Sequence, residues 1–372
     1  MSEEARGPGE EEDAVREEGR AGRDAISEEV RARRALSPED HARDALTGTA
    51  GPRRRRRRER PVVPEPEFTS YYGRPVVKPP VWKALDIAGY LFLGGLAGAS
   101  SVLSAGAELT GRPRLARGTR IGAAGAIAVS LAALVHDLGR PARFVNMLRV
   151  LKWTSPMSVG SWILSAYAPA AGAAAFSAVT GRLPRIGTAG AMAGAVAGPA
   201  VAAYTGVLLA DTAVPGWHEG HRELPYLFVS SAAAAGGGLG LLVAPLEEAT
   251  PARRMGVAGG TAELLVAHFM RRRMGIVAEA YETGRAGVLI RTAEALTGAG
   301  ALAAVLGRRN RWLSAAAGGS LLAGSALTRF GVFEAGMISS KDPKYTVVPQ
   351  RARLDARDDV NAVRPDGTVQ QR

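Results

Sequence analysis

The residues of this chain that could do chemistry are protonatable side chains near the ends of long apolar runs. Tyr204 lies about seven residues before the end of one run, so in a helix its phenol would lie roughly 10 Å inside that end. A phenol at that depth can hydrogen-bond a ligand held just inside a membrane surface, although a tyrosine near a helix end also serves as an interfacial anchor. Asp86, His136 and Asp137 lie at the ends of other runs, where a carboxylate or an imidazole can accept a proton.

Eight apolar runs must position these side chains, and each is long enough to cross a bilayer. A helix of roughly 18 or more apolar residues spans about 30 Å of hydrocarbon. Helices are the practical choice there, because they satisfy their own backbone groups where no water can. The sequence therefore predicts an all-α membrane protein with eight transmembrane helices. They are expected near residues 84–108, 118–137, 156–179, 186–209, 223–245, 252–271, 286–306 and 312–334.

Alternation of the eight helices predicts which residues share a membrane face. The starts of the odd-numbered helices and the ends of the even-numbered ones lie on one side, with the long connectors. We call this side the connector face and the other side the opposite face. The connector face gathers Tyr204, Asp86, Asp211, His218 and His221. We expect the chemistry at the connector face, because protonatable groups converge there.

The residue types exclude several kinds of redox site on this chain. It has no cysteine, so it cannot ligate an iron–sulfur cluster, form a disulfide or use a thiol nucleophile. A haem of the b type would need paired histidines at membrane depth, whereas His268 is alone in its span. Protein metal sites are not expected for the same reason. Any metal that transfers electrons would therefore belong to a partner.

Composition divides the chain into four regions. Residues 1–60 are predicted to be a disordered charged tail, 61–82 a proline-rich interfacial linker, 83–335 the membrane domain and 336–372 a polar C-terminal tail. The net charge of +12 falls mostly on helix flanks and tails, which favours contact with anionic lipid. No aromatic residues interrupt the six arginines at 53–58, and we expect no nucleic-acid partner. The tail has no export signal, which favours a cytoplasmic N-terminus.

Charged residues inside the predicted spans form a second set of candidates, because charge within a membrane is costly and often functional. Glu263, Arg291 and Glu294 could pair between helices, and the last two are spaced for a local ion pair. They either neutralise one another in packing contacts or belong to a proton path. The same two interpretations, a structural loop clamp or proton handling, apply to Asp137 and Arg140 in the connector that follows the second span.

That connector also carries the most specific motifs in the chain. The pattern DLGRP-x-R, from Asp137 to Arg143, is followed by SPMS-x-G-x-W, from Ser155 to Trp162. Both resemble the NrfD/PsrC family, the quinone-reactive membrane subunits of polysulfide reductase, nitrite-reduction and formate dehydrogenase-like complexes. Residues 89–100, 204–217 and 224–237 resemble further family motifs in the right order. The similarity covers about residues 70–340.

This resemblance implies a fold of two four-helix bundles, with a quinone pocket in the first. The family tyrosine that hydrogen-bonds a quinone carbonyl corresponds to Tyr204. Polar residues early in the first span complete the pocket in family members; here that stretch offers Asp86 but no Asn or His. Tyr204, Asp86 and His136 are therefore the expected quinone-binding residues.

The resemblance also implies partners and a location. The chain would be a multi-pass protein of a bacterial plasma membrane, exchanging electrons between menaquinone and a ferredoxin-like iron–sulfur subunit. Through that subunit it would serve a molybdopterin-type catalytic subunit, without acting on the terminal substrate itself. The alternative is a polytopic transporter or channel, which also uses glycine-rich helices, buried charges and helices broken near prolines.

Overall fold

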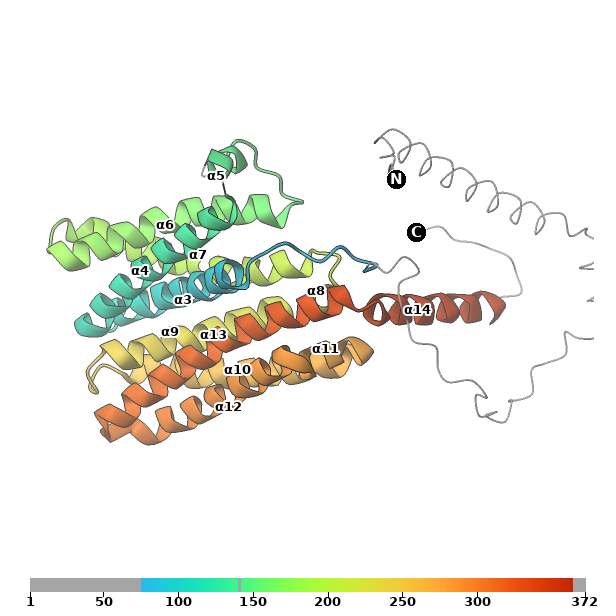
Figure 1. Ribbon diagram of the computed structural model, residues 1–372. Coiled ribbons are helices and arrows are strands. Elements are labelled where there is room, and N and C mark those ends of the chain that lie inside the picture. The colour runs from blue at the N-terminus through green and yellow to red at the C-terminus, as the bar shows by residue number, and fades with distance from the viewer. Residues whose placement is uncertain (1–74, 140–141, 364–372) are drawn as a thin grey trace, which may run out of the picture. The chain divides into compact units, whose positions relative to one another are not determined.

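A computed structural model describes residues 75–139 and 142–363, and these are helical apart from short connections (Figure 1). The predicted all-α class is confirmed for this part of the chain. The charged tail predicted at 1–60 and most of the linker predicted at 61–82 lie outside the described residues. Arg140 also lies outside them.

The first four long helices match the predicted apolar runs closely. They are α3 (Ala84–Leu109), α4 (Pro113–Asp137), α6 (Pro156–Thr180) and α7 (Pro184–Ala210), with the short α5 (Ala142–Met147) in the connector. Three of the four begin with proline, whose fixed φ suits the first helical position and whose missing N–H costs nothing there. Each helix is slightly longer than its predicted apolar run, since some of the residues that flank the run are helical as well.

The second half of the chain contains four long helices and several short ones. The long helices are α9 (Leu224–Val243), α10 (Thr250–Arg273), α12 (Gly284–Leu306) and α13 (Arg311–Lys341). The short elements are α8 (Pro215–His218), the 3-10 turns η1 (Gly275–Ala278) and η2 (Gly307–Arg309), and α11 (Glu279–Glu282). Helix α13 continues past residue 335 and is followed by α14 (Lys344–Val363), so helix occupies much of the region assigned to the polar C-terminal tail.

Helix α14 is anchored at its first residue. Lys344 Nζ donates a hydrogen bond to Glu279 Oε2 in α11 at 2.8 Å. This hydrogen bond raises the pKa of the Lys344 ammonium, because it favours the charged form. The start of α14 is therefore tied to the connector face of the second half.

Seven of the described helices are long and apolar enough to cross a membrane: α3, α4, α6, α7, α9, the stretch Gly284–Arg309 that includes α12, and α13. The chain is thus a multi-pass membrane protein. Helix α10, which corresponds to the predicted span 252–271, is similar in length but falls short in hydropathy. Its ends carry Arg253, Arg254 and Arg271–Arg273, and Glu263 lies near its middle.

The long helices pack around α3 and α9 (Figure 1). Helix α3 packs against α4, α7 and α9, while α6 packs against α4 and α7. Helix α9 packs against α10 and α13, and α12 packs against α10 and α13. The four-residue spacing of Gly190, Gly194 and Gly198 in α7 predicts close backbone approach. Gly98 of α3 and Gly198 confirm this, since a Cβ added to either would lie within 2.4 Å of the other's carbonyl oxygen.

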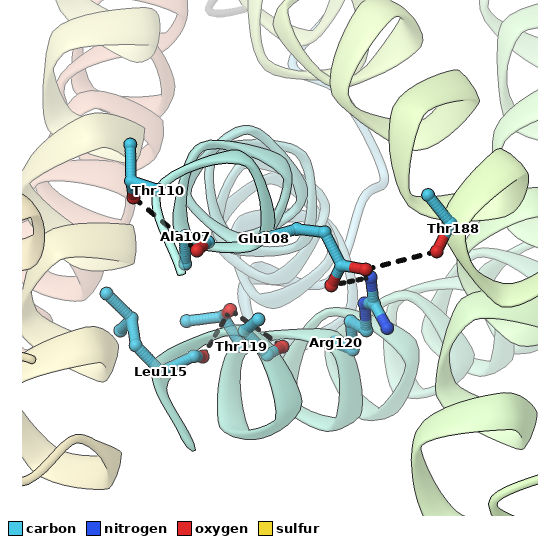
Figure 2. Close-up of polar contacts among 8 residues, drawn as sticks. Ala107, Glu108, Thr110, Leu115, Thr119, Arg120 and Thr188 are labelled. Carbon is cyan, nitrogen blue, oxygen red and sulfur yellow. Dashed lines mark hydrogen bonds and ion pairs between the residues drawn. The ribbon is translucent and has the colours of Figure 1, made fainter. Parts of the chain in front are cut away.

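Near the opposite face, one acidic side chain joins three helices of the first half. Figure 2 shows the Glu108 carboxylate of α3 bonded to both Arg120 of α4 and Thr188 of α7. Arg120 Nη2 lies 2.5 Å from Glu108 Oε2, and the Thr188 hydroxyl donates to Glu108 Oε1 at 3.1 Å. The carboxylate therefore neutralises an intramembrane arginine and also holds α3, α4 and α7 in register.

Candidate functional site

Tyr204 lies in the last third of α7 with its side chain almost fully buried, 7% exposed. Its ring lies against Gly160 of α6, where an added Cβ would come within 2.3 Å of the Tyr204 ring carbon Cε2. The glycine of the SPMS-x-G-x-W motif therefore makes room for this ring. The Tyr204 hydroxyl has no hydrogen-bond partner among the described residues. A buried hydroxyl is costly to leave unpaired, so this atom is suited to bond a ligand.

Two cavities meet at Tyr204. The inner cavity has a volume of about 130 Å³ and is lined mostly by apolar side chains of α3, α4, α6 and α7. Its walls include Trp82, Tyr90, Asp137 and Met157. The outer cavity has a volume of about 510 Å³ and opens beside the connector between α4 and α6. A mainly apolar cleft of this size with a few polar groups is the usual form of a small-molecule site.

Of the three predicted acidic and imidazole residues, Asp137 lines a cavity, whereas Asp86 and His136 do not. Asp86 Oδ2 in α3 lies 2.9 Å from His136 Nδ1 at the end of α4, and neither residue lines either cavity. The Asp86 side chain is 13% exposed and that of His136 is 66% exposed. Asp137 does line the inner cavity and interacts with the backbone of Lys83. The geometry thus joins the start of α3 to the end of α4, as a clamp would.

The outer cavity brings in residues that the sequence placed on the connector face without linking them to Tyr204. Asp211, His218 and His221 line it together with Tyr204. His218 Nδ1 lies 3.2 Å from the carbonyl oxygen of Ala210, and His221 Nδ1 lies 2.9 Å from that of His218. A carbonyl only accepts hydrogen bonds, so each Nδ1 carries a proton and, in the neutral ring, each Nε2 is an acceptor. Two proton acceptors therefore stand in the wall of the outer cavity.

The segment that carries these histidines is held firmly by its neighbours. Trp217 is fully buried, and its indole N–H donates to the carbonyl of Val332 in α13 at 2.8 Å. The Trp217 ring stacks on Trp82, with ring centroids 5.7 Å apart. The Tyr281 hydroxyl donates to the Gly216 carbonyl at 2.7 Å. Trp217, at the end of the motif 204–217, therefore ties the segment that carries the two histidines to the second half of the domain.

The intramembrane charges have partners other than those expected from their spacing. Glu294 Oε1 lies 2.5 Å from Arg271 Nη1 of α10, so the local ion pair between Arg291 and Glu294 is not formed. Arg291 Nη1 instead donates to the Glu282 carbonyl at 3.0 Å. Helical side chains point back toward the N-terminus, so the long Arg291 side chain reaches the end of α11, where Glu282 lies, while Glu294 faces α10. Glu263 is buried and accepts a hydrogen bond from Thr328 Oγ1 of α13 at 2.6 Å.

The apolar helices and the cavities at the connector face define a multi-pass membrane protein with room for a small molecule near one membrane surface. The sequence model of the NrfD family, described as polysulphide reductase NrfD, matches residues 76–338. The chain therefore belongs to the NrfD family, and the resemblance seen in its motifs is confirmed. Members of this family are membrane subunits of oxidoreductase complexes. A search of curated proteins found no match.

Proposed function

We propose that this chain is the quinone-reactive membrane subunit of an oxidoreductase complex, with Tyr204 as the hydrogen-bond donor to a quinone carbonyl. The observation that carries this proposal is the buried Tyr204 hydroxyl, which has no partner among the described residues and belongs to a residue that lines both cavities. The inner cavity suits an apolar ring, and the outer cavity supplies acceptors for protons. Menaquinone is the quinone that the resemblance implies.

The proposed reaction separates protons from electrons. Oxidation of a quinol breaks two O–H bonds, releases two protons and passes two electrons to a partner. This chain has no cysteine, so an iron–sulfur acceptor would belong to another subunit. His218 and His221 line the cavity into which the protons would pass, and Asp137 lines the other. Quinone reduction would use the same groups in the opposite direction.

A surface for the partner subunit lies on the connector between α4 and α6. Val145, Val150 and Trp153 are all strongly exposed there, Trp153 at 79%, and Trp153 also lines the outer cavity. We assign this surface to a ferredoxin-like iron–sulfur subunit, because electron transfer needs the cluster near the quinone. A molybdopterin-type catalytic subunit would lie beyond it. The N-terminus is proposed to be cytoplasmic, in a bacterial plasma membrane.

We propose that α10 is an eighth membrane span, despite its polarity. Glu248, in the loop before α10, accepts hydrogen bonds from the backbone N–H groups of Arg114 and Leu115 at the start of α4. The start of α4 lies at the opposite face. Tyr281, after α10, bonds Gly216 at the connector face. The chain must cross the membrane between these points, and α10 is the long helix between them. The eight spans then form two four-helix bundles, α3–α4–α6–α7 and α9–α10–α12–α13, in agreement with their packing.

No observation favours the transporter alternative. Its expected feature is a helix broken near a proline, and the prolines inside the predicted spans that could break a helix are Pro169 and Pro199. Both prolines lie inside continuous helices, α6 and α7.

The proposed function is tested by Tyr204→Phe in the purified complex. This change removes one oxygen and keeps the ring packed against Gly160. A lost hydrogen bond of about 1 kcal/mol corresponds to a roughly fivefold loss of kcat/KM for quinol oxidation. Tyr226→Phe is the matched control, because the Tyr226 side chain of α9 is 70% exposed and lines neither cavity. Equal rates for both variants and the wild type would refute the assigned site.

A further inference from the structure

A second polar site lies inside the other half of the membrane domain, away from Tyr204. Glu263, near the middle of α10, is 2% exposed. Its Oε1 accepts the Thr328 hydroxyl at 2.6 Å, and its Oε2 is buried without a protein partner among the described residues. A carboxyl oxygen in this position requires either a proton of its own or a donor such as water.

A small cavity adjoins this carboxyl. Its volume is about 20 Å³, which is room for one water molecule, and Glu263, Thr297 and Thr328 line it. The Thr297 hydroxyl is also buried without a partner among the described residues. A water in this cavity would therefore have two otherwise unpaired polar atoms to bond, together with the threonine already bonded to Glu263. The cavity is thus polar enough to hold water.

The same cavity is also lined by residues nearer the connector face. Arg271 and Glu294, joined by a 2.5 Å ion pair, lie in its wall and are partly exposed. Tyr281, which is fixed to Gly216 at the connector face, lies in its wall too. The same small cavity is therefore lined by a buried carboxyl at mid-membrane depth and by an ion pair nearer the surface.

A buried arginine lies close enough to Glu263 to balance the charge of its ionised form. Arg329 of α13 is fully buried, lies 3.9 Å above the Phe228 ring and donates to the Phe228 carbonyl at 2.7 Å. Arg329 interacts electrostatically with Glu263 but does not form a direct ion pair with it among the described contacts. Ser231 of α9 lies beside the carboxyl, but its hydroxyl donates to Ser325 at 2.8 Å and not to Glu263 Oε2. An ionised Glu263 is balanced by Arg329, and the Arg271–Glu294 pair is neutral by itself.

We propose that Glu263 is an exchangeable proton-binding site, filled from the connector face through the cavity lined by Arg271 and Glu294. In the transfer, the cavity water gives a proton to Glu263 Oε2, an O–H bond forms there, and the water regains a proton from the connector face beside Glu294. The reverse order empties the site. This site lies in a different helix group from Tyr204, and its proton exchange does not depend on quinone chemistry.

Infrared spectroscopy of the full-length protein in lipid nanodiscs tests the proposal, because a protonated carboxyl has a C=O stretch distinct from that of a carboxylate. We expect a protonated-carboxyl band in the wild type that shifts in D2O and is lost in Glu263→Gln. Glu108→Gln, which changes a carboxylate near the opposite face, is the matched control and should keep the band. Glu294→Gln should keep the band but slow its D2O shift at least tenfold.

Thr328→Val provides a second readout with Glu263 still in place. It removes the 2.6 Å hydrogen bond to Oε1, so the Glu263 band should move to higher frequency. Absence of a protonated band in the wild type at every pH at which the protein is folded would overturn the proposal, since Glu263 would then be a fixed counter-ion of Arg329. A band that does not shift in D2O would overturn it too. An unchanged exchange rate in Glu294→Gln would overturn the route.

Discussion

At the scale of single residues, the site depends on one tyrosine and the glycine that makes room for it. The Tyr204 hydroxyl is buried without a partner among the described residues, and Gly160 lies against the ring. A hydroxyl of this kind costs stability unless a ligand or water satisfies it. In Tyr204 this unpaired hydroxyl belongs to a residue that lines both cavities. A ligand in the cavities would satisfy the hydroxyl, and this is the physical basis for assigning Tyr204 to ligand binding.

Gly160→Ala is expected to disturb the site without touching the hydroxyl itself. The new methyl group would lie 2.3 Å from a ring carbon, so the Tyr204 ring must move. Displacement of a positioned donor commonly costs far more than its size suggests, and we expect about a tenfold loss of kcat/KM for quinol. Gly172→Ala in the same helix is the control, since nothing lies within 4 Å of its added Cβ. Similar rates for Gly160→Ala and this control would contradict the positioning of the ring.

Asp86→Asn tests whether Asp86 binds quinone in the pocket or joins α3 to α4 through His136. Asp86 bonds His136 and lines neither cavity, so we expect KM for quinol to change less than twofold. Thermal unfolding in detergent should show a stability loss of up to about 1 kcal/mol, because the pair is partly exposed. His136→Gln should behave in the same way. A large KM change with unchanged stability would instead return Asp86 and His136 to the quinone-binding set.

At the scale of the elements, close backbone contacts decide how the helices cross. Gly98 of α3 meets Gly198 of α7, and Gly237 of α9 meets Gly256 of α10, where an added Cβ at Gly237 would lie 2.3 Å from the backbone nitrogen. Small residues allow this approach, which drives helix association in a membrane through van der Waals contact. The contact between α9 and α10 also places the polar α10 within the helix group rather than beside it.

The crossing of α10 can be measured directly, because the chain has no cysteine to remove first. Glu247→Cys lies in the exposed loop before α10, and Arg285→Cys lies in the exposed first turn of α12. If α10 spans the membrane, an impermeant thiol reagent applied to one side of oriented vesicles should label only one of the two. Arg222→Cys, just before α9, should share the side of Arg285→Cys. Labelling of Glu247→Cys and Arg285→Cys from one side would exclude the eighth span.

At the scale of the whole molecule, the membrane domain accounts for the family and for the candidate site. The family match covers residues 76–338, and every residue that lines the two cavities at Tyr204 lies within it. The region 1–60 has long blocks of charge and no apolar face to contribute to a helix bundle.

Deletion of residues 1–60 is therefore expected to leave the membrane domain folded and active with quinol. Membrane insertion, thermal unfolding and quinol oxidation by the assembled complex should each match the full-length chain within about twofold or 0.5 kcal/mol, since substitutions outside packed features seldom exceed that. Loss of insertion in the truncated chain would show that the charged region has a structural role.

The sequence by itself determined the membrane class, the position of nearly every long helix and the family. Hydropathy is a local property summed along a segment, and motifs such as DLGRP-x-R are read without knowing where the helices lie.

The tertiary structure decided which side chains meet. Sequence spacing pointed to Arg291 as the partner of Glu294, yet Arg271 of α10 takes that place. The family resemblance made Asp86 an expected quinone-binding residue, and the structure adds that Asp86 pairs with His136 and lines neither cavity. Such partners depend on the rotation and crossing of each helix, which are set by distant backbone contacts such as Gly98 on Gly198.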